Sequence, residues 1–228
     1  MLTLLTNNGS GGFGFSARLN VGLYPNCIAV GDINGDGELD LITANYGTNT
    51  LTVLTNNGSG VFGSNATLVV GNGPFSVAAV DLNGDGKLDL ISANYDDGTL
   101  TVLTNNGGGA FGFNATIAVG THPAQVVAAD VNGDGKPDLI CANEGDNTLT
   151  VLTQVIASPT LSITSTGSNT VTISWPSSAT GFTLQTNSDL STTNWAPVGY
   201  AISTNGPTQS VTLAPPPAGN LFFRLSLP

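Results

Sequence analysis

The sequence contains few charged residues, and positively charged residues are the rarest of them. Lys, Arg, Asp and Glu make up 8% of the 228 residues, and only four of them are Lys or Arg against fifteen acidic residues. With a net charge of −11, the chain has no electrostatic basis for holding nucleic acid or an anionic membrane surface. Its polar surface must therefore come from Asn, Thr, Ser and Gly, a composition that favours a secreted all-β protein.

Cysteine, histidine and long apolar segments are equally scarce. Cys27 and Cys141 form neither a disulfide framework nor a zinc motif, and we expect two small buried thiols. His122 is the single histidine and no nucleophile motif accompanies it, so we expect no catalytic residues and no enzyme. No apolar run approaches the ~18 residues of a membrane-spanning helix. Met1 leads directly into Leu2–Thr6 without a signal-peptide pattern, so we expect any export signal to lie outside this chain.

A repeat with a period of 49 residues organises the first two thirds of the chain. Asp32, Asp81 and Asp130 open three copies of one motif at this spacing, with no insertion between them. Repeats of 40–50 residues with strand-like segments are typical of propeller blades built from four antiparallel strands. We therefore expect an all-β fold with three four-stranded blades, and with too few blades for a closed ring.

The strand pattern defines where we expect each blade to begin. In the second repeat, β-branched and alternating apolar residues predict four strands, at 66–71, 76–80, 88–93 and 99–104. On this frame residues 2–6 are a surplus copy of the fourth strand. We therefore expect an open or incomplete propeller over 1–155.

The period disappears after about residue 155. Residues 156–228 are rich in Thr, Ser and Pro, and they contain alternating segments around Trp175 and Val211. Such alternation, with Trp175, Trp195 and Phe222–Phe223 as candidate core residues, predicts a small β-sandwich as a second domain.

The nonapeptide D-x-N-G-D-G-x-x-D, at 32–40, 81–89 and 130–138, holds ten of the fifteen acidic residues. Calcium prefers six to eight oxygen ligands, and alternate residues of a tight loop can turn their oxygens toward one point. The predicted ligands, with the seventh position contributing its backbone carbonyl, are Asp32, Asn34, Asp36, Glu38 and Asp40; Asp81, Asn83, Asp85, Lys87 and Asp89; and Asp130, Asn132, Asp134, Lys136 and Asp138. We therefore expect about three Ca²⁺ ions per chain and no other cofactor.

Three alternatives explain the nonapeptide less well than calcium does. A plain hairpin turn would explain the glycines but not the Asp at positions 1, 5 and 9 of every copy. An EF-hand needs an acidic residue at position 12 and a following helix, whereas Thr43, Ser92 and Cys141 stand there and the next residues read as strand. Magnesium demands strict octahedral geometry and keeps its water ligands, whereas this loop is expected to supply nearly all of the ligands itself.

These motifs resemble the FG-GAP, or VCBS-type, repeat of integrin α-subunit propellers and bacterial surface proteins. The resemblance is carried by Phe-Gly at Phe13, Phe62 and Phe111, by a following G-x-x-P, by the nonapeptide and by the L-I-x-A-N segment after it. It implies a calcium-binding β-propeller that works outside the cell or on its surface, with calcium at the same loop positions. The C-terminal segment resembles fibronectin type III-like modules.

The function expected from these patterns is an extracellular calcium-binding structural or adhesion protein, with no nucleic-acid partner and no membrane insertion. The surplus strand suggests self-association, either by ring completion or head to tail, because an unpaired strand edge is a template for another chain. The plainer alternative is that the chain is a fragment of a longer propeller. One alternative is a lectin-like module that binds glycans or proteins through Tyr46, Phe75 and Tyr95. Another is an accessory module of a larger secreted enzyme.

Overall fold

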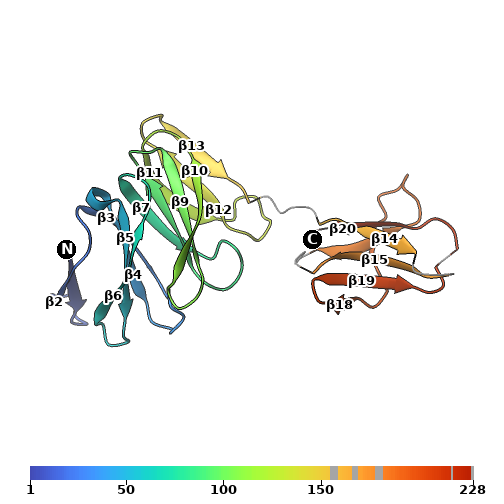
Figure 1. Ribbon diagram of the computed structural model, residues 1–228, viewed down its shortest axis with the longest axis horizontal. Helices are drawn as coiled ribbons and strands as arrows, with labels where there is room; N and C mark the ends of the chain where they lie inside the picture. Colours follow the sequence, from blue (N-terminus) through green and yellow to red (C-terminus); the bar gives the residue numbers. More distant parts are fainter. Residues whose placement is uncertain (155–158, 166–168, 178–181, 217, 227–228) are drawn as a thin grey trace. The chain divides into compact units, whose positions relative to one another are not determined.

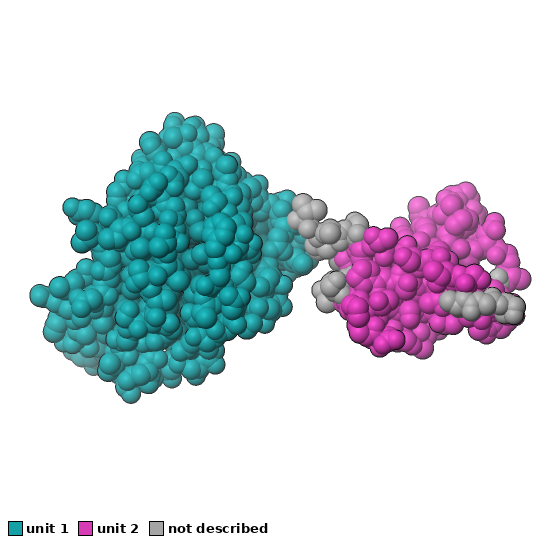
Figure 2. Space-filling model, in the orientation of Figure 1, with its two compact units in different colours: residues 1–154 teal, residues 155–228 magenta. Residues whose placement is uncertain are grey.

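The computed structural model describes residues 1–154, 159–165, 169–177, 182–216 and 218–226. The chain forms two compact units, residues 1–154 and 155–228, which are coloured separately in Figure 2. The described residues form β-strands and one short 3₁₀ helix, η1 (Tyr46–Thr48), so the predicted all-β class is confirmed. No helix among the described residues is long and apolar enough to cross a membrane.

Unit 1 contains thirteen strands in four antiparallel sheets, arranged as a row in Figure 1. The N-terminal hairpin consists of β1 (Leu2–Asn7) and β2 (Phe13–Leu19). Blade 1 consists of β3 (Pro25–Gly31), β4 (Asp40–Asn45), β5 (Thr50–Asn56) and β6 (Phe62–Val69). Blade 2 consists of β7 (Pro74–Val80), β8 (Asp89–Asn94), β9 (Thr99–Asn105) and β10 (Phe111–Ala118). Blade 3 consists of β11 (Pro123–Ala129), β12 (Asp138–Asn143) and β13 (Thr148–Leu152).

These sheets confirm open, propeller-like blades, but they correct the frame in which each blade was predicted. The segment predicted as the first strand of a blade pairs instead as the fourth strand of the blade before it: β6 pairs with β5, and β10 with β9. Two blades therefore have four strands and the third has three. Residues 2–6 are not a surplus fourth strand but a third strand, and they pair with β2.

The reason for this frame lies in the turns. Asn106 donates its backbone N–H to the carbonyl of Ala110 and closes a tight hairpin between β9 and β10. Such Asn-Gly-rich turns join neighbouring strands of one antiparallel sheet. The connection after β10 leads instead to the next blade. The Asn-Asn-Gly turns in the sequence indicate where each blade begins, because they lie within a blade and not between two blades as expected above.

The core of unit 1 lies between successive blades. Blades 1 and 2 share a cluster that includes Ile42, Leu51 and Leu90, each fully buried. Blades 2 and 3 share a second cluster that includes Ile91 and Leu100. Blade 2 thus buries one face against blade 1 and the other against blade 3, as expected when alternate residues of a strand point to opposite faces.

A buried Asn beside the core of each blade organises a small polar network. In blade 1, Asn45 donates from Nδ2 to the hydroxyls of Thr50 and Thr52, and it accepts a bond from Thr43 Oγ1. In blade 3 the residue at the Thr43 position is Cys141, and Asn143 Oδ1 is the one buried side-chain oxygen without a partner in the described part of the chain. Burial raises the pKa of the Cys141 thiol to about 11, so the thiol stays protonated.

We expect Cys141→Ser to stabilise unit 1 by about 1 kcal/mol, because a hydroxyl restores the hydrogen bond that Ser92 makes to Asn94 in blade 2. Chemical denaturation followed by circular dichroism measures this change. Cys27→Ser, at a half-buried thiol, is the matched control and should bring no comparable gain. A loss of stability in Cys141→Ser would contradict the expectation.

Unit 2 consists of two sheets that share one core. One sheet has the order β14 (Ser162–Ser165), β15 (Val171–Pro176), β19 (Thr208–Leu213), β18 (Ser203–Asn205); the other has the order β17 (Ala196–Pro197), β16 (Thr183–Asn187), β20 (Phe222–Ser226). Trp175 from the first sheet and Leu184 from the second are both buried in the shared cluster. Trp195 is only half-buried, with the Arg224 guanidinium 4.5 Å from its ring centre.

Candidate metal centre

The three nonapeptide loops occupy the same place in each blade. Each loop joins the first strand of its blade to the second, so in blade 1 it connects β3 to β4. The backbone at Gly35 and Gly37 has φ of +80° and +89°, and the corresponding glycines of the other loops also have positive φ. Such angles favour glycine strongly and let the chain fold back over its own first Asp.

The Asp at position 9 of each loop is buried and anchors the loop through hydrogen bonds. Asp89 is 1% exposed, and Asp40 and Asp138 are fully buried. Asp89 accepts backbone N–H bonds from Leu82 at 3.1 Å and from Asn105 at 2.9 Å, which ties the loop to the end of the third strand. The same two bonds recur in the other loops. Position 9 therefore holds the loop against the sheet.

The Asp at position 1 is the centre of each loop. The Asp32 carboxylate accepts N–H bonds from Gly35, Asp36 and Gly37 at 2.8–3.2 Å. Asp81 and Asp130 accept the same three bonds. These donors, with that of Gly37 the strongest, lower the pKa of Asp32, and the matching donors lower that of Asp130. The carboxylates of Asp32 and Asp130 are therefore held ionised at neutral pH.

Positions 3 and 5 complete an oxygen-rich rim. Asn34 Oδ1 accepts the backbone N–H of Asp36 at 2.9 Å, and Asp36 Oδ1 accepts that of Glu38 at 2.9 Å. The other two loops repeat both bonds. The second oxygen of position 5 has different partners: Asp36 Oδ2 and Asp134 Oδ2 accept from the Asn side chain of position 3, whereas Lys87 Nζ lies 3.0 Å from Asp85 Oδ2 in loop 2. This ion pair lowers the pKa of Asp85 and places a cation of the protein's own beside the loop.

The side chain at the end of the third strand was not predicted to matter, yet it links each loop to the following blade. Asn105 Nδ2, from blade 2, donates to the backbone carbonyl of Ile33 in the loop of blade 1 at 2.8 Å. Gln154 Nε2, from blade 3, donates to the carbonyl of Leu82 in the loop of blade 2 at 2.6 Å. Ile33 itself is 2% exposed in the core between the blades. Loops 1 and 2 are therefore parts of blade-to-blade contacts.

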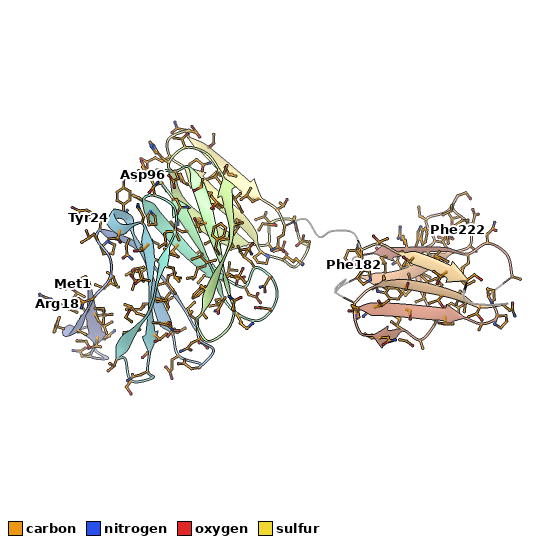
Figure 3. The ribbon with its side chains drawn as sticks, in the orientation of Figure 1. Met1, Arg18, Tyr24, Asp96, Phe182 and Phe222 are labelled. Carbon is orange, nitrogen blue, oxygen red and sulfur yellow. The ribbon has the colours of Figure 1, made fainter. Side chains whose placement is uncertain are left out.

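A row of aromatic rings crosses from blade to blade at the opposite ends of the strands. Phe75 stacks on Tyr95 with centroids 5.1 Å apart, and Tyr95 stacks on His122 at 4.4 Å. Tyr46 meets Phe75 edge to face and donates its hydroxyl hydrogen to Asp96, whose place is marked in Figure 3. The stacked rings cover one another's faces, and these contacts hold neighbouring blades together.

The donor set of the loops fits calcium by its chemistry. Each loop offers three Asp carboxylates, one amide oxygen and backbone carbonyls, and it contains no Cys or His. Hard oxygen ligands of this kind suit Ca²⁺ or Mg²⁺ rather than zinc or copper. Within the residues that the structure describes, no three His, Cys, Asp or Glu side chains converge closely enough to hold a metal ion. The carboxylates are instead held apart on backbone N–H groups.

Comparison with protein families identifies the repeat. A profile described as FG-GAP-like repeat matches residues 32–92 and again 81–141, each time starting at the first Asp of a nonapeptide. A second profile, FG-GAP repeat, matches residues 122–173. The last match runs beyond blade 3 into residues that the structure places in unit 2. No curated protein sequence matches the chain significantly.

Proposed function

Because this chain is an FG-GAP repeat protein, we propose that it is an extracellular, calcium-stabilised structural or adhesion module without catalytic activity. FG-GAP repeats are structural and binding modules, and they are typical of proteins outside the cell or on its surface. The observation that carries the proposal is the threefold recurrence of one loop, with the same hydrogen bonds at positions 1, 3, 5 and 9.

The residues that would hold the ion in loop 1 are Asp32, Asn34, Asp36 and Asp40, with the backbone carbonyl of Glu38, and their counterparts would serve in loops 2 and 3. A bound Ca²⁺ would neutralise carboxylates that otherwise repel one another at short range. Because loops 1 and 2 carry residues packed against the next blade, stiffening them would also stiffen the contacts between blades. Calcium at the millimolar concentrations found outside cells suits loops of this type.

Isothermal titration calorimetry with CaCl₂ tests the proposal. We expect about three ions per chain, with dissociation constants of roughly 10⁻⁴–10⁻³ M or somewhat tighter. Changing Asp32, Asp81 and Asp130 together to Asn should abolish binding, whereas changing the turn residues Asp97 and Asp146, which lie outside the loops, should leave it intact. Heat exchange that is the same for the parent and the loop variant would refute calcium binding.

Loop 2 offers a sharper prediction. We expect Lys87→Ala to strengthen calcium binding at that loop modestly, because the exposed ion pair no longer competes for Asp85. The same calorimetric titration measures the change. Lys136→Ala is the matched control at loop 3, and weaker binding in Lys87→Ala would contradict the expectation.

The lectin-like alternative receives less support from the geometry. Tyr46, Phe75 and Tyr95 do lie together, but their rings pack on one another and on His122. Sugars are usually held on a free aromatic face, and this row uses its faces internally. We therefore propose for it the role of an interblade fastening.

A further inference from the structure

Blade 3 lacks the strand that completes blades 1 and 2. Among the described strands, β13 pairs with β12 alone, whereas its counterparts β5 and β9 each pair on both edges. The residues 49 positions after β10 begin at Thr160, which lies in unit 2 and carries no Phe-Gly. The free edge of β13 is therefore a place where a fourth strand fits.

A pocket marks the missing strand. It measures about 340 Å³, lies between blades 2 and 3, and is lined by Leu82, Val102, Ile117, Leu139 and Leu152 among others. The counterparts of these five residues one repeat earlier are Ile33, Val53, Leu68, Leu90 and Leu103, which form a filled cluster together with Phe111 of β10. The pocket is thus the space that a Phe of a fourth strand occupies between blades 1 and 2.

The chain carries a matching fourth strand at its other end. β2 begins with Phe13-Gly14, which corresponds to Phe62-Gly63 of β6 and Phe111-Gly112 of β10. Phe13 is 67% exposed, and its only strand partner is β1 in a two-stranded sheet. Met1 and Arg18 mark this hairpin at one end of the row of blades in Figure 3, while β13 lies at the other end in Figure 1. Because β2 and β13 lie at opposite ends of the row, β2 cannot pair with β13 of its own chain in this arrangement.

The faces of the two end blades are also apolar and uncovered. On blade 3, Leu149 is 69% exposed and Val151 is 50% exposed, although their counterparts Leu100 and Val102 are buried in blade 2. On blade 1, Ile28 is 50% exposed, although its counterpart in blade 2 is buried. These are the two kinds of surface that already pack together between blades 1 and 2 and between blades 2 and 3.

We propose that β2 of a second copy of this chain completes blade 3, with Phe13 in the pocket and the completed blade packed against blade 1 of that copy. The β13 segment Leu149-Thr150-Val151-Leu152 is a repeat copy of Leu2-Thr3-Leu4-Leu5 in β1. β13 then takes the place of β1 beside β2, and Leu149 pairs with Leu19 as Leu2 does now. A two-stranded hairpin is only marginally stable, so this exchange opens little structure.

The same exchange covers the exposed residues named above on the two end blades. Strands β11 and β12 of one copy would lie over blade 1 of the second copy, on the part that the hairpin leaves uncovered, and they would cover Ile28 there. Blade 1 of the second copy would in turn cover Leu149 and Val151. Each copy then has three four-stranded blades, the third of them completed by β2 of the other copy. Two copies that exchange β2 reciprocally have six blades, within the four to eight blades of closed propellers. The proposal is therefore a closed ring of two copies.

The mass of the full chain in solution, by light scattering at concentrations up to about 100 µM, provides the test. We expect a species of twice the monomer mass. Leu4→Pro, which weakens the pairing of β1 with β2, should tighten the dimer, since the hairpin then competes less for β2. Monomers for both the parent and Leu4→Pro would overturn the proposal, and a series of still larger species would overturn the ring.

Two further variants identify the surfaces. Phe13→Asp and Leu149→Asp change exposed side chains, so both should fold, and each alone should be monomeric. Mixed together they should form a 1:1 dimer, because one copy keeps its donor strand and the other its acceptor blade. Phe113→Asp, at an equally exposed Phe on blade 2, should remain dimeric. Failure of the mixture to associate would overturn the proposal. Calcium binding, measured separately, can hold or fail independently of it.

Discussion

We expect calcium to raise the melting temperature of unit 1 by roughly 5–10 °C for each loop filled at a hundredfold excess over its Kd. A ligand that binds only the folded state at that excess contributes about 2.7 kcal/mol. One kcal/mol shifts the melting temperature of a domain of this size by about 2–4 °C. Contributions from separate loops should add, because the loops lie in different blades.

The chain contains an internal control for this measurement. Both tryptophans, Trp175 and Trp195, lie in unit 2, and unit 1 has none. Tryptophan fluorescence therefore follows the unfolding of unit 2 alone, whereas far-UV circular dichroism follows the strands of both units. Calcium should raise the dichroism transition of unit 1 and leave the fluorescence transition in place. Equal shifts in both, or no shift relative to chelator, would contradict loop-specific binding.

We expect Asp89→Ala to destabilise unit 1 by about 2–5 kcal/mol even in chelator. The substitution leaves the N–H groups of Leu82 and Asn105 without their acceptor, and each unsatisfied buried donor costs about 1–3 kcal/mol. Such a loss is a large part of the stability of a typical domain. Urea denaturation followed by circular dichroism measures it.

The matched control lies in the same loop. Asp85 is also acidic but exposed, and its partners are Lys87 and Asn83 at the rim. Without calcium, Asp85→Ala should therefore reduce the stability of unit 1 far less than Asp89→Ala does. Both variants should lose calcium binding at loop 2. A similar loss of stability in both would mean that position 9 is not the structural brace that the hydrogen bonds indicate.

The repeat and the local chemistry could be read from the sequence. A fixed step between Asp32, Asp81 and Asp130 and the alternation of apolar residues predicted an all-β fold with propeller-type blades, which the sheets confirm. The conformation of each loop has a local origin, because the hydrogen bonds of positions 1, 3 and 5 join residues of the same nonapeptide. Calcium in these loops and the fibronectin type III-like character of unit 2 remain predictions.

Other properties depend on contacts between residues far apart in the sequence. A perfect period is unchanged when its starting point moves by one strand, so the period alone leaves the frame of the blades open. The Asn-Asn-Gly turns indicate the frame, and the strand pairing shows that β10 completes blade 2 and that blade 3 has three strands. The hydrogen bond from Asn105 to Ile33 joins residues 72 positions apart, and no local sequence pattern predicts it. Leu100 and Leu149 share one residue type and one repeat position, yet one is fully buried and the other is 69% exposed. The sequence by itself determined which faces are apolar; the tertiary structure decided which of them have a neighbour, because burial requires a second surface that the repeat alone cannot place.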